Sequence, residues 1–124
     1  NNGLTLLNLI EKNFIISAHD VSLGGIITAI SKMCIKGEKG IQIKKPKFLI
    51  NEIEYFFAED QGRYLIEINP KDFKEVSKIL DKNSVHYDEI GKIIDKEMII
   101  DQKTKLTIDE LKSYNTNWLK SYMV

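Results

Sequence analysis

An apolar run typical of a β-strand stands just before a helical pattern near the start of the 124-residue chain, and this pairing constrains the fold most. Residues 14–18 (Phe-Ile-Ile-Ser-Ala) are bounded by polar residues and suit a buried strand. Apolar side chains then recur at i, i+3, i+4 and i+7 between Leu23 and Cys34, which predicts an amphipathic helix over residues 22–36. Ser22 is the candidate N-cap. Together the two patterns predict a helix packed on a sheet.

The remaining segments repeat the same two patterns, separated by polar turns. Further helices are expected at residues 4–12, at 50–57, after Asn69 from Pro70 onward, and after a capping box at residues 107–110. Extended segments are expected at residues 40–44, 63–68, 85–87, 90–94, 98–100 and 105–106. The sequence therefore predicts a single α+β domain over all 124 residues (1–124), a layered α/β/α arrangement with a mixed sheet. That sheet should contain residues 14–18 and 63–68, with the stripe of Ile26, Ile30 and Met33 packed on it.

Charge and composition exclude several classes of protein. Lys plus Arg and Asp plus Glu both number 18, so the zero net charge predicts neither a nucleic acid nor an anionic membrane as a partner. The longest apolar runs are a few residues, far short of the roughly 20 that a membrane helix needs. Cys34 is the only cysteine, which excludes an internal disulfide, and with two histidines it argues against a zinc site. We therefore expect a cytoplasmic protein, and residues 1–3, which lack an initiator Met, suggest a cut within a longer chain.

The segment Ser-Ala-His-Asp-Val-Ser-Leu-Gly-Gly at residues 17–25 is the strongest candidate for a ligand site. A helix N-terminus attracts anions through its free N–H groups, and Gly24 and Gly25 would let a ligand approach the backbone closely. Asp20, at the strand end, stands where a carboxylate could hold Mg²⁺ against a phosphate. The structural alternative is favoured: Asp20 or Ser22 caps the helix and the glycines permit close packing, since the spacing matches neither a P-loop nor a GxGxxG fingerprint.

The turn before the extended segment at residues 63–68 is a second candidate. Arg63 is the only arginine of the chain, and it follows Glu59 and Asp60 across a glycine turn. Because a guanidinium can bind carboxylates bidentately, we predict that Arg63 forms a structural clamp with Glu59 or Asp60. The functional alternative, which the residues favour less, places Arg63 against an anionic ligand.

Three motifs follow one another along the chain. The first is His-Asp-Val-Ser-Leu-Gly-Gly-Ile at residues 19–26, the second Phe-Ala-Glu-Asp-Gln-Gly-Arg-Tyr-Leu-Ile at residues 57–66, and the third Asn-Trp-Leu-Lys-Ser-Tyr-Met at residues 117–123. Ile-Gly-Lys-Ile at residues 90–93 fits with them as the strand before a last hairpin. Together they resemble the C-terminal domain of AIR synthase related proteins and, within that superfamily, phosphoribosylformylglycinamidine synthase subunit II. The resemblance extends over residues 4–123.

The resemblance implies a function in purine synthesis. The family enzyme converts formylglycinamide ribonucleotide, glutamine and ATP to the amidine, as an ATP-dependent C–N ligase. Its subunit II has two repeats of two halves each, and this chain resembles the last of these four pieces. The main ATP site, the substrate site and the catalytic histidine lie mostly upstream, so we expect the chain alone to be inactive, with no catalytic residue of its own. The implied partners are the remaining domains of subunit II, the glutaminase subunit and the small accessory subunit, and the implied cofactors are ATP and Mg²⁺.

At the first motif the resemblance implies an auxiliary, pseudo-symmetric nucleotide site. Asp20 would be a metal ligand there, and Ser22 with Gly24 and Gly25 would lie near the nucleotide. The family pattern usually has Asp where this sequence has Leu23, so a second carboxylate is missing, which favours a mainly structural role for the turn. The alternative is a standalone nucleotide- or phosphate-binding module of the same superfamily, which would be expected to begin with Met and to cover its own hydrophobic face.

Overall fold

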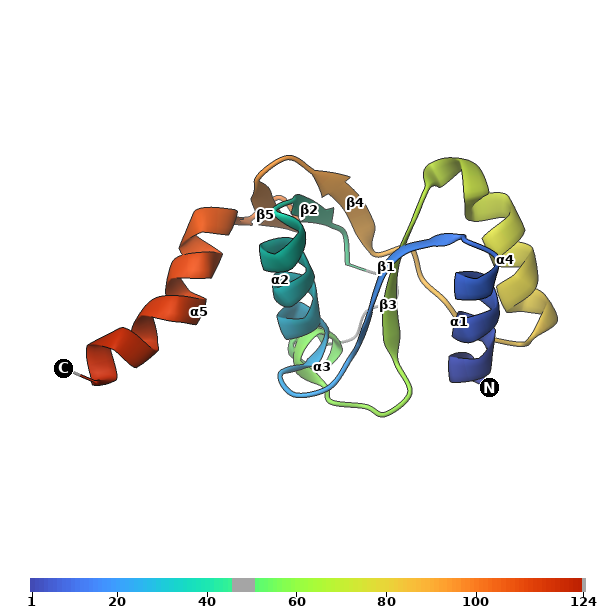
Figure 1. Ribbon diagram of the computed structural model, residues 1–124, viewed down its shortest axis with the longest axis horizontal. Helices are drawn as coiled ribbons and strands as arrows, with labels where there is room; N and C mark the ends of the chain where they lie inside the picture. The colour runs from blue at the N-terminus through green and yellow to red at the C-terminus, as the bar shows by residue number, and fades with distance from the viewer. Residues whose placement is uncertain (46–50, 124) are drawn as a thin grey trace. The chain divides into compact units, whose positions relative to one another are not determined.

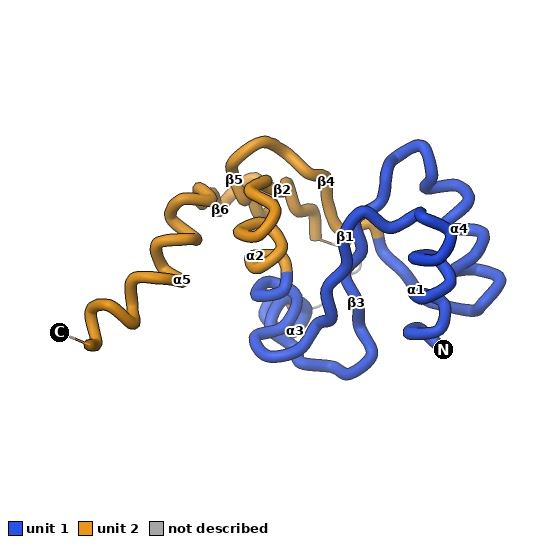
Figure 2. The backbone as a smooth tube through the Cα atoms, viewed as in Figure 1, with its two compact units in different colours: residues 1–29, 53–88 blue, residues 30–52, 89–124 orange. Residues whose placement is uncertain are grey.

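The computed structural model describes residues 1–45 and 51–123, and Figure 1 shows the helices and strands of this part of the chain. Its contacts fall into two compact units, which Figure 2 draws in separate colours. Unit 1 consists of residues 1–29 and 53–88, and unit 2 of residues 30–52 and 89–124. Each unit has a sheet of its own.

Unit 1 is built on a two-stranded antiparallel sheet of β1 and β3. Its elements in chain order are α1 (Asn2–Glu11), β1 (Ile15–Asp20), the start of α2 (Gly25–Gly37), α3 (Glu52–Phe57) from its second residue, β3 (Tyr64–Ile68), the 3₁₀ turn η1 (Pro70–Asp72) and α4 (Phe73–Lys82). In the register of the sheet, Ala18 lies opposite Ile66 and Asp20 opposite Tyr64. The last residue of β1 is therefore held directly beside the first residue of β3.

The core of unit 1 forms between α1, α4 and this sheet. Leu9 of α1 is buried together with Val76 and Leu80 of α4, which stand four residues apart on one face of that helix. The partly buried side chains around them are Phe14, Ile15, Ile66, Ile68, Ile79, Val85 and Tyr87. Asn69 begins the helical segment as predicted, because its Oδ1 accepts a hydrogen bond from the Lys71 N–H at 3.1 Å.

Unit 2 contains a four-stranded mixed sheet and the last helix of the chain. Its elements are the rest of α2, β2 (Gly40–Ile43), β4 (Gly91–Ile94), β5 (Glu97–Ile100), β6 (Thr104–Thr107) and α5 (Ile108–Tyr122). The strand order is β4-β2-β5-β6, with β2 parallel to β5 and the other neighbours antiparallel. Ile41 and Ile43 of β2, Met98 of β5 and Ile108 of α5 are buried, and Cys34 is a buried thiol.

The predicted α+β class with a mixed sheet is confirmed, but the strands belong to two sheets. The segments expected at residues 14–18 and 63–68 form the separate sheet of β1 and β3 and take no part in the mixed sheet. A hydrophobic pattern identifies an extended segment, whereas its hydrogen-bonding partner depends on the rest of the fold. Ile26 and Ile30 of the predicted helix stripe are buried, and Met33 is half-buried.

Three local expectations change, and a fourth lies partly outside the described residues. The helix expected from Ser22 begins at Gly25, because the left-handed φ values of Gly24 (+81°) and Gly25 (+70°) prevent an α-helical turn from forming before them. β1 is not a fully buried strand: its residues alternate between partial burial and exposure because one face meets the core. Residues 85–87 belong to no strand. The helix expected at residues 50–57 is α3, and the first residue of that range lies outside the described residues.

Across residues 1–45 and 51–123, the structure contains no helix whose length and apolar character would let it cross a membrane.

Candidate functional site

The turn between β1 and α2 holds the residues that the sequence singled out. Asp20 ends β1, and the ladder of the sheet continues one residue further because the Val21 N–H donates to the Arg63 carbonyl at 2.9 Å. The Asp20 side chain is 65% exposed. Nδ1 of His19 lies 3.4 Å from Oδ1 of Asp20 and 2.6 Å from its carbonyl oxygen. The carboxylate of Asp20 is thus held at the end of a strand and is accessible from solvent.

Both glycines of the turn have a structural reason to be glycine. Gly24 and Gly25 have φ values of +81° and +70°, in the left-handed region that other residues rarely adopt. A Cβ on Gly24 would lie 2.2 Å from Oγ1 of Thr28, and a Cβ on Gly25 would lie 2.5 Å from the Phe56 carbonyl oxygen. The start of α2 therefore packs directly on the backbone of α3, and the space that a ligand could use at Gly25 is filled by that backbone.

Two backbone donors of the turn, the N–H groups of Gly24 and Gly25, are already engaged. The Gly24 N–H donates to Oε1 of Glu59 at 2.8 Å, and the Gly25 N–H donates to the Ser22 carbonyl at 3.0 Å. The Ser22 side chain, the expected cap, is exposed. A carboxylate thus takes the place at the start of α2 that a phosphate oxygen would need. Sequence reasoning missed this contact, since Glu59 and Gly24 stand 35 positions apart and nothing in their spacing indicates that they meet.

Arg63 joins the turn before β3 to the end of α3. Its Nη1 lies 3.3 Å from Oδ2 of Asp60 and 3.4 Å from the Ala58 carbonyl, and its Nη2 lies 3.4 Å from the Tyr55 carbonyl. Its guanidinium carbon stands 5.9 Å from the centre of the Tyr55 ring. Burial raises the pKa of the Tyr55 hydroxyl, so that ring stays neutral. The structure brings Arg63 together with Asp60, whereas Glu59 turns to Gly24.

We expect Arg63→Lys to lower the free energy of unfolding by about 1 kcal/mol, because one ammonium group cannot reach Asp60 and both carbonyls together. Thermal unfolding of the purified chain measures the change. Lys74→Arg, an exposed exchange on α4, is the control and should leave the melting temperature unchanged. In the full-length protein the Arg63 variant should keep its activity; normal stability with lost activity would place Arg63 against a ligand instead.

The described residues do not by themselves surround a metal ion. Among residues 1–45 and 51–123, no three His, Cys, Asp or Glu side chains are grouped so that they could hold one. Leu23, three positions after Asp20 in the turn, is 78% exposed and offers no ligand atom. Mg²⁺ in nucleotide sites usually takes one or two carboxylates and completes its shell with phosphate oxygens and water. Asp20 could therefore supply one oxygen ligand to such a site and no more.

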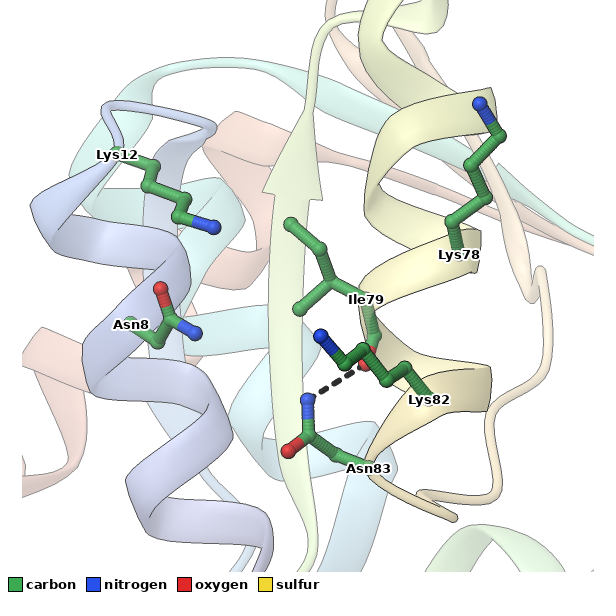
Figure 3. A pocket seen from close by; sticks show the side chains of 6 residues that line it. All are labelled: Asn8, Lys12, Lys78, Ile79, Lys82 and Asn83. Carbon is green, nitrogen blue, oxygen red and sulfur yellow. Dashed lines mark hydrogen bonds between the residues drawn. The ribbon is translucent and has the colours of Figure 1, made fainter.

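A pocket of about 260 Å³ between α1 and α4 was not anticipated from the sequence. Figure 3 shows Asn8 and Lys12 extending from α1, and its remaining lining residues are Lys78, Ile79, Lys82 and Asn83. Lys12 and Lys82 stand at the C-terminal ends of their helices, where positive charge complements the helix dipole. Asn83 donates to the Ile79 carbonyl at 2.7 Å, and Lys78 pairs with Glu75 at 2.8 Å. Asn83 and Lys78 thus have partners within the protein, and the helix dipole accounts for the positions of Lys12 and Lys82.

Residues 4–103 match the family described as AIR synthase related protein, C-terminal domain. Over 123 residues the chain is 61% identical to phosphoribosylformylglycinamidine synthase subunit PurL of Pelagibacter ubique, with 99% of this chain and 17% of that protein aligned. It is 33% identical over 121 residues to the PurL subunit of Bartonella henselae, with 98% of this chain and 16% of that protein aligned. The chain thus spans about a sixth of the length of these curated relatives.

Solved structures share the fold. The structure described as T. maritima PurL complexed with FGAR matches 86% of this chain and 19% of its own, with a TM-score of 0.73 and 19% identity. Structures described as T. maritima PurL complexed with ATP and as PurLQS from Thermotoga maritima each match with a TM-score of 0.72 and 18% identity, over 86% of this chain and 20% of theirs. At this level of identity the likeness shows the fold alone.

Proposed function

The chain belongs to the AIR synthase related protein, C-terminal domain family, and we propose that it is one domain of a phosphoribosylformylglycinamidine synthase subunit II. The observation that carries this proposal is the 61% identity to the Pelagibacter ubique subunit over 123 residues. That alignment continues past residue 103, where the family match ends, and so includes α5. Relatives of this kind support a synthase subunit over a standalone binding module.

The activity we propose for the whole subunit is the conversion of formylglycinamide ribonucleotide to the amidine, with ATP and glutamine consumed. This is C–N ligase chemistry in which ATP activates an amide oxygen by phosphoryl transfer. The role of this chain in that reaction is mainly structural. The glycines of the β1–α2 turn serve packing, and Arg63 binds the end of α3. The described residues therefore supply a scaffold for the subunit.

An auxiliary nucleotide site at the β1–α2 turn is a second part of the proposal. Asp20 would supply one oxygen ligand to Mg²⁺, and Ser22 with Gly24 and Gly25 would lie beside the nucleotide. Mg²⁺, when bound, would neutralise phosphate charge that Asp20 alone would repel. The exposure of Asp20 supports this role. Glu59 opposes it, because a phosphate at Gly24 must displace the carboxylate that now accepts its N–H.

We expect Asp20→Ala in the full-length subunit to weaken binding of Mg²⁺–ADP at the auxiliary site about tenfold or more, since a direct oxygen ligand is lost. Glu59→Gln should tighten the same binding, because it removes a negative charge next to the phosphates. Calorimetric titration measures both, and Asp81→Ala, at an exposed position of α4, is the control. An affinity that Asp20→Ala leaves unchanged would rule out the metal role.

The partners we propose are those of the synthase: the remaining domains of subunit II, a glutaminase subunit and a small accessory subunit, all in the cytoplasm. Support comes from the length of the relatives, of which this chain covers 17%, and from the fold shared with a chain of the Thermotoga maritima PurLQS structure.

The function is tested by growth. A bacterial strain without its subunit II gene should grow in the absence of purines when it carries the full-length gene that encodes this chain. The purified full-length protein, with its glutaminase partner, should form the amidine from formylglycinamide ribonucleotide, glutamine and ATP. A folded, well-expressed protein that supports neither growth nor amidine formation would overturn the proposal.

A further inference from the structure

The last helix carries a row of apolar side chains that none of the described residues of unit 2 covers. Tyr114, Trp118, Leu119 and Tyr122 are all exposed, Trp118 by 61% and Tyr122 by 85%. Tyr114, Trp118 and Tyr122 follow one another at intervals of four, so they lie on one side of α5. We call these four residues the α5 aromatic face. Contiguous exposed apolar surface, especially with a polar rim, is a mark of interaction sites.

Among the described residues of unit 2, contacts anchor only residues 108–112 of α5. Thr107 and Glu110 form a capping box, in which hydrogen bonds from Thr107 lower the pKa of Glu110. Ile108 is buried, and Lys112 pairs with Glu38 at 2.5 Å. From residue 113 to residue 122 every side chain of the helix is exposed. Most of α5 therefore has no packing partner among the described residues of unit 2.

The sequence of this outer part is poor at forming a helix alone. Residues 113–122 read Ser-Tyr-Asn-Thr-Asn-Trp-Leu-Lys-Ser-Tyr, and only Leu119 and Lys120 are strong helix formers. Helices of this length are marginal in water even with favourable sequences, so proteins stabilise them by burying an apolar side. Polar side chains of this part find hydrogen-bond partners within the helix: the Thr116 hydroxyl, for example, donates to the Lys112 carbonyl at 2.9 Å. What remains to be covered is the α5 aromatic face.

We propose that the α5 aromatic face docks on another part of the same synthase subunit, on an apolar surface outside these 124 residues. The inference rests on the proposed function. Two observations select this occupant. The family match ends at residue 103, whereas the 61% identity to a PurL subunit continues over α5. The helix is therefore a feature shared with that subunit rather than part of the family domain alone. The relatives are about six times longer than this chain, and their additional residues could provide the apolar surface on which α5 docks.

Covalent linkage favours this occupant over a second copy or a separate subunit. A segment joined by the same polypeptide has an effective local concentration in the millimolar range when its linker can span the two sites. A second copy or another subunit must instead associate from dilute solution and lose translational freedom. Trp and Tyr are the residue types most enriched at the centres of such interfaces. A surface of the same polypeptide is therefore the partner that the α5 aromatic face binds at the lowest entropic cost.

Site-specific photo-crosslinking in the full-length subunit tests the proposal. A photoreactive phenylalanine replaces Trp118, and in a matched protein it replaces Lys120, which stands about 200° further around α5. We expect position 118 to crosslink within one polypeptide, to residues outside the 124 of this chain, with at least tenfold the yield at position 120. Links to a second copy, links to the glutaminase or accessory subunit, or equal yields at the two positions would overturn the proposal.

A second measurement uses ordinary variants. Trp118→Ser in the full-length subunit should speed amide hydrogen exchange over residues 113–122 tenfold or more, whereas Lys120→Gln, which keeps a strong helix former, should leave it unchanged. Equal exchange in the two variants would contradict docking through the aromatic face. The test is separate from that of the function: an active subunit without the crosslink refutes the docking alone, and an inactive subunit with the crosslink refutes the proposed activity alone.

Discussion

Gly25→Ala is expected to lower the free energy of unfolding by about 3 kcal/mol. Part of this cost comes from the φ of +70°, which an alanine adopts only with strain of about 1–2 kcal/mol. The rest comes from the new Cβ, which would stand 2.5 Å from the Phe56 carbonyl oxygen and 2.6 Å from the Phe57 carbonyl carbon. These are backbone atoms of α3 that cannot turn aside, so α3 must shift.

Thermal or urea unfolding of the chain measures this loss, and the same helix offers a matched control. Gly37 ends α2, and a Cβ there meets no atom within 4 Å. Gly37→Ala should therefore be neutral or raise stability by a few tenths of a kcal/mol, through the lower entropy of the unfolded chain. Equal effects of the two substitutions would show that α2 and α3 do not pack at Gly25 in solution.

The chain by itself is expected to form no amidine. Phosphoryl transfer to an amide oxygen depends on positioned donors and on neutralised charge around the phosphates. In the described residues the Gly24 N–H already binds Glu59, Arg63 binds Asp60 and backbone carbonyls, and no three His, Cys, Asp or Glu side chains are grouped so that they could hold a metal ion by themselves. These parts are too few for the reaction, whatever substrate is supplied.

The assay supplies ATP, formylglycinamide ribonucleotide and either glutamine or ammonia to the purified chain, with and without the remaining part of the subunit. We expect product at the level of the blank from the chain alone and clear turnover only when the remaining part is present. Ammonia as nitrogen source removes the need for the glutaminase, so an inactive mixture cannot be attributed to its absence. Turnover by the chain alone would refute a mainly structural role.

Much of the local structure could be predicted because it depends on neighbours in the sequence. The capping box of Thr107 and Glu110 and the cap at Asn69 involve residues two or three positions apart, and both are present. The helix stripe of Ile26 and Ile30 is buried for the same reason, since the period of 3.6 residues puts both on one side. The start of α2 was misplaced by three residues because a left-handed glycine cannot be recognised from its type alone.

The candidate site was only half predictable. Arg63 and Asp60 stand three positions apart, so their pairing could be expected from the sequence, and the structure places them 3.3 Å apart. Glu59 was assigned to the same clamp, yet it accepts the Gly24 N–H instead. The contact between Glu59 and Gly24 joins two turns of unit 1. These turns lie close together because β1 pairs with β3 and because α3 packs against Gly25.

The sequence by itself determined most of the helical and extended segments, the α+β class and, through its motifs, the family of the domain. These properties follow from periodicity and local capping, which each segment carries independently of its partners. Only the tertiary structure decided that the strands form two sheets, that Glu59 binds the first turn of α2, and that α5 leaves Trp118 exposed. Strand partners, contacts between distant turns and exposure depend on loop closure and packing between segments, and no local pattern encodes them.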